Sequence, residues 1–192
     1  MKRSLYVMSS VLILTLFSGA EVETWQIDPA HSATQFSVRH MGISTVRGTF
    51  TKTSGVLKYD PADLSKSSLD ATIETKSVDT RVEMRDNDLR SPNFFDVEKY
   101  PTITFKSKHV EANGDGKLKV TGDLTIHGTT KEVVLDVDGP SNPVKDPKGN
   151  LHMGASATTK VNRKDFGVSG APSMVGDDVE ITIDTELVKP AK

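Results

Sequence analysis

Alternating apolar and polar residues, the pattern of a half-buried β-strand, recur along most of the chain. The first run is short: Trp25 and Ile27 share one face, and Pro29 ends it. Later runs are separated by turns such as the glycine-containing stretch at 113–116. The pattern predicts about eight or nine antiparallel strands. After the first run, the positions that share a face are Phe36, Val38 and His40; Val46, Gly48 and Phe50; Leu69, Ala71 and Ile73; Ile103 and Phe105; Leu118, Val120, Gly122, Leu124 and Ile126; Val133, Leu135 and Val137; the odd positions of 153–161; and the odd positions of 179–187. A further short run covers 56–59.

One segment breaks the alternation and has the features of a short helix. Residues 80–83 read Thr-Arg-Val-Glu, which fits a capping box in which the Thr80 hydroxyl accepts from the Glu83 amide. Ser91-Pro92 then predicts a second short turn, whose Phe94 and Phe95 would pack onto the sheet. By contrast, the proline-rich stretch at 139–149 is predicted to be the least regular part of the chain.

Eight or more strands in one chain must protect their edges, and a sandwich or a closed barrel does so. Small residues at inward positions bear on this choice, because they leave room for a slender ligand inside a barrel. The same glycines could instead mark bulges and bends, and periodicity alone leaves both readings open. These small inward residues are Gly48, Ala71, Gly122, Ala155 and Ala157.

The N-terminus has the composition of an export signal. Lys2 and Arg3 precede an apolar stretch, and Ser18-Gly19-Ala20 follows it, so we predict a Sec-type signal peptide at 1–20 that is cleaved after Ala20. The apolar stretch is too short for a membrane anchor. Removal of the predicted signal peptide takes away Lys2 and Arg3 and leaves 22 basic and 26 acidic residues, a net charge of −4. We therefore expect an exported protein, with the periplasm as its simplest destination.

Composition excludes several classes of function. The 192 residues include no cysteine, which excludes disulfide scaffolds, thiolate nucleophiles and cysteine-ligated metals. Charged residues make up 26% of the chain and form no basic run, so nucleic-acid binding is not expected. None of the five histidines has metal-ligand spacing, and no metal site is predicted.

An ordered series of short motifs resembles the YceI-like family, the lipid- or polyisoprenoid-binding periplasmic proteins. Each motif alone is weak, but the series covers residues 24 to about 187 in the order of the family, which is nearly all of a predicted domain at 21–192. The motifs are WQIDPAHS (25–32), FSVRH (36–40), VRGTF (46–50), SVDT (77–80), RD (85–86), LRS (89–91), NFFDV (93–97), YP (100–101), TF (104–105), GDLTIHG (122–128), NRKDFG (162–167) and VGDDV (175–179).

The resemblance implies an all-β fold with one short helical segment: an elongated, lipocalin-like antiparallel barrel of about eight strands. Its lumen would hold one long isoprenoid or acyl lipid, such as a polyprenyl lipid, an isoprenoid quinone or a fatty-acid derivative, and no other cofactor is expected. The alternative is a packed barrel that acts as a stress-related interaction module without a stable ligand. The residues expected to line the lumen are Phe36, Val38, His40, Val46, Gly48, Phe50, Ala71, Ile73, Phe105, Gly122 and Leu124.

Two polar groups are candidates for a contact with the ligand headgroup at the rim. Arg85 and Arg90 could clamp a phosphate, or could simply pair with acidic neighbours on an exposed helix. Asn162, Arg163 and Asp165 could meet a headgroup, or form a polar cluster that fixes the rim.

Catalysis is not expected, because the chain has no G-x-S-x-G motif and its adjacent carboxylates at 177–178 would point to opposite faces of a strand. A lipid-modifying enzyme would need a polar group inside the lumen, for which His40 is the candidate. A carrier should contact membranes transiently, and a barrel with free strand edges is compatible with a homodimer. A lumen of this kind predicts that larger residues at Gly48, Ala71 or Gly122 block the ligand while the fold survives.

Overall fold

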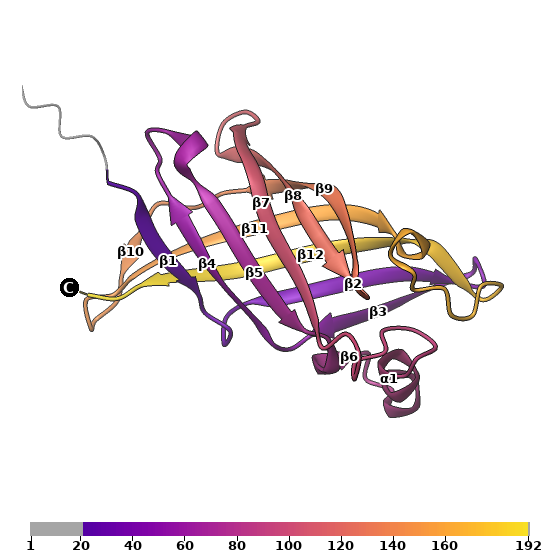
Figure 1. Cartoon of the computed structure of the whole chain (residues 1–192). Helices are drawn as coiled ribbons and strands as arrows, with labels where there is room; N and C mark the ends of the chain where they lie inside the picture. Colours follow the sequence, from indigo (N-terminus) through magenta and orange to yellow (C-terminus); the bar gives the residue numbers. More distant parts are fainter. Residues whose placement is uncertain (1–20, 192) are drawn as a thin grey trace, which may run out of the picture.

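The computed structural model describes residues 21–191, so the predicted signal peptide at 1–20 lies outside the described residues. The described chain forms strands throughout, with one α-helix and three short 3-10 helices (Figure 1). The elements are β1 (Glu23–Ile27), β2 (Ala33–His40), β3 (Ser44–Phe50), β4 (Thr53–Tyr59), η1 (Leu64–Lys66), β5 (Ser68–Glu74), η2 (Thr75–Ser77), β6 (Val78–Asp79), α1 (Glu83–Arg90), β7 (Thr102–Ala112), β8 (Lys117–Ile126), β9 (Thr129–Asp138), β10 (Val144–Lys145), β11 (Leu151–Asn162), η3 (Arg163–Phe166) and β12 (Val175–Lys189).

Eight strands close into an antiparallel barrel. They follow the order β11-β9-β8-β7-β5-β4-β1-β12, and pairing of β12 with β11 closes the ring. This closure decides between the sandwich and the barrel that periodicity left open, and it confirms the predicted fold. In Figure 1 the barrel is elongated, with β1, β4, β5 and β7 crossing one side at a steep angle to β11 and β12 behind them.

β12 is the longest strand and holds the barrel together along its length. One edge pairs with β11 over residues 178–189. The other edge pairs first with β2, over residues 175–184, and then with β1, at 187–188. Strands β2 and β3 therefore extend the sheet beyond the ring at one end, and the short β6 pairs with the outer edge of β3.

Most inward side chains of the strands belong to one apolar cluster that follows the long axis of the barrel. A smaller cluster lies at the end where β1 begins and β12 ends, and it contains Trp25, Met153 and Leu187. The period-2 alternation places these side chains inside because successive residues of a strand point to opposite faces. In residues 21–191 no helix is long and apolar enough to cross a bilayer.

The predicted helix is present, but the predicted capping box is wrong. Val82 is the N-cap residue, and no side chain caps the helix there. Thr80 instead donates both its backbone N–H and its hydroxyl to the buried Asp86 carboxylate. Arg81 has a positive φ of 64°, which separates Thr80 from the first helical turn. The Asp86 carboxylate, from the end of the first turn, therefore binds Thr80 in place of Glu83.

The 139–149 stretch is largely irregular, as predicted, but it includes one short strand and a fixed turn. It contains β10, whose Val144 pairs with His152 of β11. The Asp146 carboxylate accepts hydrogen bonds from the backbone N–H groups of Lys148 and Asn150, which fixes the following turn. An Asx-type turn of this kind is built by one short side chain, and the count of prolines does not reveal it.

Candidate ligand cavity

An elongated apolar cavity of about 250 Å³ occupies the interior of the barrel. Inward side chains of all eight ring strands contribute to its wall, together with β2 and Phe50 of β3. Several of these side chains, including Phe36, Ile181 and Ile183, are only partly buried although they point inward. Their exposed area faces the cavity, so the barrel is not packed to the density of an ordinary core.

Helix α1 and the turn that follows it close part of the cavity wall. Leu89, Phe94 and Phe95 line the cavity from outside the ring of strands. The Phe95 ring lies edge-on to Phe50 with centroids 5.7 Å apart, and Phe50 lies 5.7 Å from Phe36. The prediction that this segment packs onto the sheet is therefore confirmed for Phe95, whereas Phe94 lies beside Gly170 in the loop before β12. The part of the cavity wall next to Phe50 is therefore covered by aromatic rings from the helical segment.

Seven of the eleven predicted lumen residues line the cavity. They lie on β2, β3, β5, β7 and β8, the strands whose alternation is clearest in the sequence. Whether they contact a ligand stays a prediction. The seven are Phe36, Val38, Phe50, Ala71, Ile73, Phe105 and Leu124.

Two predicted lumen residues, Gly48 and Gly122, do not line the cavity, because phenylalanine rings cover them. A Cβ atom on Gly48 would lie 2.4 Å from the ring of Phe36, its direct partner across β2 and β3. A Cβ atom on Gly122 would lie 2.5 Å from the ring of Phe105. These glycines leave space for aromatic rings, not for a ligand. A larger residue at either position would collide with a phenylalanine ring, so we now expect it to disturb the fold, contrary to the expectation from the sequence.

The other two, His40 and Val46, lie in the β2–β3 hairpin where it extends beyond the ring. His40 pairs with Ser44 beside the turn, and Val46 pairs with Val38. Neither residue belongs to the cavity wall. Strand β3 pairs with β2 and β6 and is not part of the ring. Phe50, at its end, is therefore the residue of β3 that lines the cavity. His40 is therefore not placed to act on a molecule in the lumen.

Sequence reasoning omitted much of the wall formed by the last strands. The signal was present, because the inward positions of β9, β11 and β12 alternate as clearly as those of β2. Ala155 and Ala157, noted above as small inward residues, do line the cavity. The omitted lining residues on these strands are Leu135, Val137, Ser156, Thr159, Val161, Val175, Val179, Ile181, Ile183, Asp184, Thr185 and Leu187.

One end of the barrel is closed by the Trp25 cluster. Trp25 is fully buried, and its indole Nε1 has no hydrogen-bond partner within the described part of the chain. Tyr59 packs against this cluster and lines the cavity. Burial raises the pKa of the Tyr59 hydroxyl above its usual value.

The opposite end is closed around Arg163. Its guanidinium donates to the carbonyls of Val168, Gly170, Val175 and Gly176 at 2.8–3.0 Å. These bonds bind the loop that follows η3 to the start of β12. Burial lowers the pKa of Arg163, and the Asp177 carboxylate at 3.7 Å opposes this effect.

The other predicted rim residues lie outside the cavity wall. Asn162 accepts a hydrogen bond from the backbone of Lys164, and Asp165 is exposed. Arg85 donates to the hydroxyl and carbonyl of Thr80, and Arg90 donates to the carbonyls of Lys76 and Val78. These contacts attach α1 to the chain that precedes it. Of the five rim candidates only Arg163 lines the cavity, and its donors are directed at backbone carbonyls.

One group of side chains in the described residues could hold a divalent cation. Ligand atoms of Asp28, His31 and Glu186 lie within 4.8 Å of one another, outside the barrel lumen. His31 Nδ1 lies 2.8 Å from Asp28 Oδ2, and this hydrogen bond raises the pKa of His31 and lowers that of Asp28. Sequence spacing could not reveal the group, because Glu186 lies on β12 and the other two precede β2.

The chemistry that the cavity supports is apolar binding. The side chains in its wall, taken over residues 21–191, include no histidine, and the ionisable ones are Tyr59, Arg163 and Asp184. Arg163 is engaged with backbone carbonyls, and no carboxylate pair or nucleophile–base pair faces the lumen. The arrangement therefore suits a long hydrocarbon chain and provides no recognisable acid–base site.

Comparison with known proteins agrees with this architecture. The YceI-like domain matches residues 25–187. A UPF0312 protein of Vibrio cholerae is 37% identical over 188 residues, which cover 96% of this chain and 98% of the relative. The match extends over the whole barrel, including the cavity wall and α1.

Solved structures share the fold. The YCEI protein of Campylobacter jejuni is 36% identical, with a TM-score of 0.69 over 78% of this chain and 88% of that one. A polyisoprenoid binding domain from Saccharophagus degradans is 14% identical, with a TM-score of 0.64 over 88% of this chain and 100% of that one, and shows the fold alone. The chain belongs to the YceI-like domain family.

Proposed function

We propose that this protein is a periplasmic carrier that sequesters one long-chain apolar amphiphile, such as a polyisoprenoid, an isoprenoid quinone or a fatty-acid derivative, in its barrel. The observation that carries the proposal is the apolar cavity lined from all eight ring strands. The name of the Saccharophagus degradans domain, a polyisoprenoid binding domain with the same fold, supports this class of ligand. The absence of an acid–base site in the cavity wall supports binding without catalysis.

The size of the cavity argues for a bound molecule. An apolar cavity that stays empty destabilises a protein by about 24 cal/mol per Å³, so about 250 Å³ corresponds to roughly 6 kcal/mol. Whole domains are stable by only about 5–15 kcal/mol. A hydrocarbon chain in the lumen would restore much of this loss by contact with the wall. A barrel that acts only through its outer surface would gain nothing from a cavity that lowers its stability.

Exchange with a membrane also fits an apolar lumen. Each CH₂ group that leaves water contributes about 0.8 kcal/mol, but a bilayer is as apolar as the lumen. Transfer of the tail between the two is therefore near neutral, and the direction of transfer depends on the headgroup and the entrance. This balance suits a carrier that contacts membranes transiently and returns its ligand to them.

Native mass spectrometry tests the proposal. The protein would be exported to the periplasm, purified without detergent, and measured before and after solvent extraction. We expect an added mass that matches one extracted isoprenoid or acyl lipid. Recovery of protein without added mass, together with failure to take up quinone or polyprenyl lipids, would support the interaction module instead.

Matched substitutions test whether the lumen is the binding site. Ala157→Phe places a ring in the cavity, whereas Thr158→Phe places it on the outer face of the same strand, where Thr158 is exposed. We expect the first variant to lose the bound lipid and the second to keep it. Ala71→Leu on β5 is a milder variant for the case that Ala157→Phe does not fold. Retention of lipid by folded Ala157→Phe and Ala71→Leu would show that the lipid binds elsewhere.

A further inference from the structure

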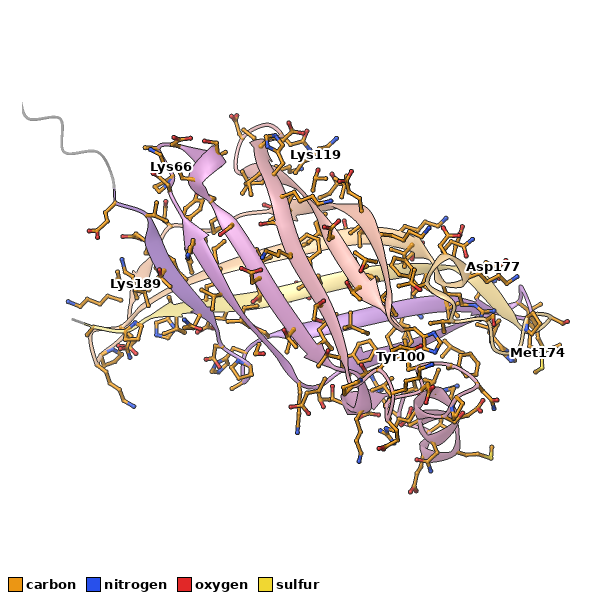
Figure 2. All side chains as sticks on the ribbon, viewed as in Figure 1. Lys66, Tyr100, Lys119, Met174, Asp177 and Lys189 are labelled. Carbon is orange, nitrogen blue, oxygen red and sulfur yellow. The ribbon has the colours of Figure 1, made fainter. Side chains whose placement is uncertain are left out.

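Three of the most exposed large apolar side chains of the described chain lie together at one tip of the barrel. Met41 and Ile43, in the β2–β3 turn, are 58% and 78% exposed, and Met174, in the loop before β12, is 49% exposed. The two segments are joined by a hydrogen bond from the Met41 N–H to the Met174 carbonyl at 2.7 Å. Figure 2 shows Met174 at the end of the molecule opposite Lys189.

This apolar tip, defined as residues 40–46 and 166–176, contains no Lys, Arg, Asp or Glu, in a chain with 26% charged residues. Arg39 and Arg47 lie directly behind it on the outer face of β2 and β3. Two of the nearby acidic groups are paired, Asp177 with Lys164 at 2.9 Å and Asp178 with Lys160 at 2.6 Å, whereas Asp165, directly before the second segment, is exposed. An uncharged apolar tip with cations behind it is complementary to the interface of an anionic bilayer.

The β2–β3 turn places a large apolar side chain where turn geometry favours another residue. Met41 and Gly42 both have positive φ, 51° and 71°, and the Ile43 N–H donates to the His40 carbonyl. A non-glycine residue at positive φ is usually Asn or Asp, since most other side chains are strained in this conformation. A methionine at this position costs conformational energy and exposes an apolar side chain to solvent. Backbone strain of this kind points to a role other than stability.

The second half of the tip is held in place before any contact is made. Arg163 binds four carbonyls of residues 168–176, as described above, and the Met174 N–H donates to the Ala171 carbonyl. A pre-organised surface loses little conformational entropy on binding. Val168 and Val175 of the same loop line the cavity, so the tip is continuous with one end of the lumen.

We propose that this apolar tip inserts into the interface of an anionic lipid bilayer and so docks the barrel on the membrane with which it exchanges lipid. The proposal deepens the carrier function and rests on it for its purpose. Without residues 1–20 the chain carries a net charge of −4, so a bilayer of anionic lipids repels most of its surface. The tip is the face on which apolar area and positive charge coincide.

Vesicle flotation tests the docking surface. The mature protein is mixed with vesicles of phosphatidylethanolamine and phosphatidylglycerol, or of phosphatidylcholine alone, and its partition coefficient is measured. We expect binding to the anionic vesicles that weakens as salt increases. Ile43→Asp should lower the partition coefficient by roughly tenfold or more, since withdrawing one side chain of this size from an apolar phase changes partitioning by about that factor. Arg47→Glu should weaken binding to the anionic vesicles alone.

Matched variants separate docking from folding. Met41→Asn relieves the strained turn, so it should preserve or raise thermal stability while it lowers vesicle binding. Val144→Asp removes an apolar side chain that is 67% exposed at the opposite end, and it should bind vesicles as the parent protein does. Met84→Asp does the same on α1, where Met84 is 82% exposed beside the acidic Glu83.

Three results would overturn the proposal: no binding to either kind of vesicle, equal loss in Ile43→Asp and Val144→Asp, or loss in Met84→Asp with none in Ile43→Asp. Dimers that form without vesicles and vanish in Ile43→Asp would assign the tip to contact between two copies. Native mass spectrometry on the same variants reports cavity loading separately. If the tip binds vesicles but the cavity takes up no lipid, the docking proposal is supported and the proposed carrier function is wrong.

Discussion

At the scale of single residues, the interior of this barrel is shaped by pairs of glycine and phenylalanine. The Phe36 ring lies over Gly48, and the Phe105 ring lies over Gly122, which is the diagonal neighbour of Phe105 across β7 and β8. Each glycine lets an aromatic ring lie flat against the sheet, and the ring covers backbone that the glycine would leave bare. The cavity wall is therefore smooth and aromatic at these positions.

A Cβ atom at Gly122 should be costly. It would lie 2.5 Å from the Phe105 ring and 2.6 Å from the Lys106 carbonyl oxygen, so ring and backbone would both have to move. We expect Gly122→Ala to lower the free energy of unfolding by about 1–3 kcal/mol, measured by urea denaturation. Gly154→Ala is the control, because its Cβ atom would come no closer than 3.9 Å to Thr185. That variant should be neutral or more stable by about 0.5 kcal/mol, and equal losses in both would contradict the ring-packing argument.

At the scale of elements, the 139–149 segment is attached to the barrel by a histidine between two carboxylates. His152 Nδ1 lies 2.7 Å from Glu186 Oε1, and its Nε2 lies 3.2 Å from Asp146 Oδ2. Hydrogen bonds to Glu186 and Asp146 raise the pKa of His152. Burial would raise the pKa of Asp146, but hydrogen bonds from Asn150 and His152 prevail and lower it to about 2. The ion pair therefore holds β10 and its turn against β11 and β12.

This arrangement makes the attachment pH-dependent. Because the folded-state pKa of His152 is raised, its contribution is complete below the ordinary value of about 6.5 and is lost as the pH rises through the raised pKa. We expect His152→Gln to lower Tm at pH about 5.5 and to leave it nearly unchanged at pH about 9, by scanning calorimetry. His109→Gln, on the exposed face of β7, is the control. An equal Tm loss at both pH values would mean that His152 acts by packing alone.

Helix α1 is attached in a different way, through the buried Asp86. Removing this carboxylate would leave the Thr80 N–H and hydroxyl without their acceptor, in a buried site. We expect Asp86→Ala to cost about 1–3 kcal/mol and to speed amide hydrogen exchange in residues 80–97. Glu83→Ala, at an exposed position of the same helix, should change stability by less than about 0.5 kcal/mol. Unchanged exchange in Asp86→Ala would show that aromatic packing alone holds the segment.

At the scale of the whole molecule, ligand and barrel should stabilise each other, because the cavity belongs to the folded state alone. A ligand at a hundred times its dissociation constant adds about 2.7 kcal/mol, which corresponds to roughly 5–10 °C in Tm for a domain of this size. We expect solvent extraction to lower Tm and re-addition of the extracted lipid to restore it. Ala157→Phe should not respond to the lipid, and an equal response in that variant would place the lipid outside the cavity.

Sequence alternation predicted most strands because inward and outward residues repeat with a period of two, but it left sandwich and barrel open, and the barrel was expected from the family resemblance. Alternation could not show which strand closes the ring: β12 pairs with β1 and β2 from the other end of the chain. The error at Gly48 and Gly122 has the same origin, since the covering ring belongs to another strand. The capping box failed for a local reason, because Asp86 competed with Glu83 for Thr80. Contacts between distant segments, such as Glu186 with His31, leave no spacing signal.

The position of β12 in the ring has a consequence for how the chain folds. Until this last strand is available, β11 and β2 each present an open edge, and the barrel has no means of closure. Pairings over such large sequence separations also form slowly, because a long loop must be ordered before they contribute. A partly delivered chain therefore cannot close the barrel. For a protein that we propose is threaded across a membrane before it folds, this delay keeps it competent for translocation.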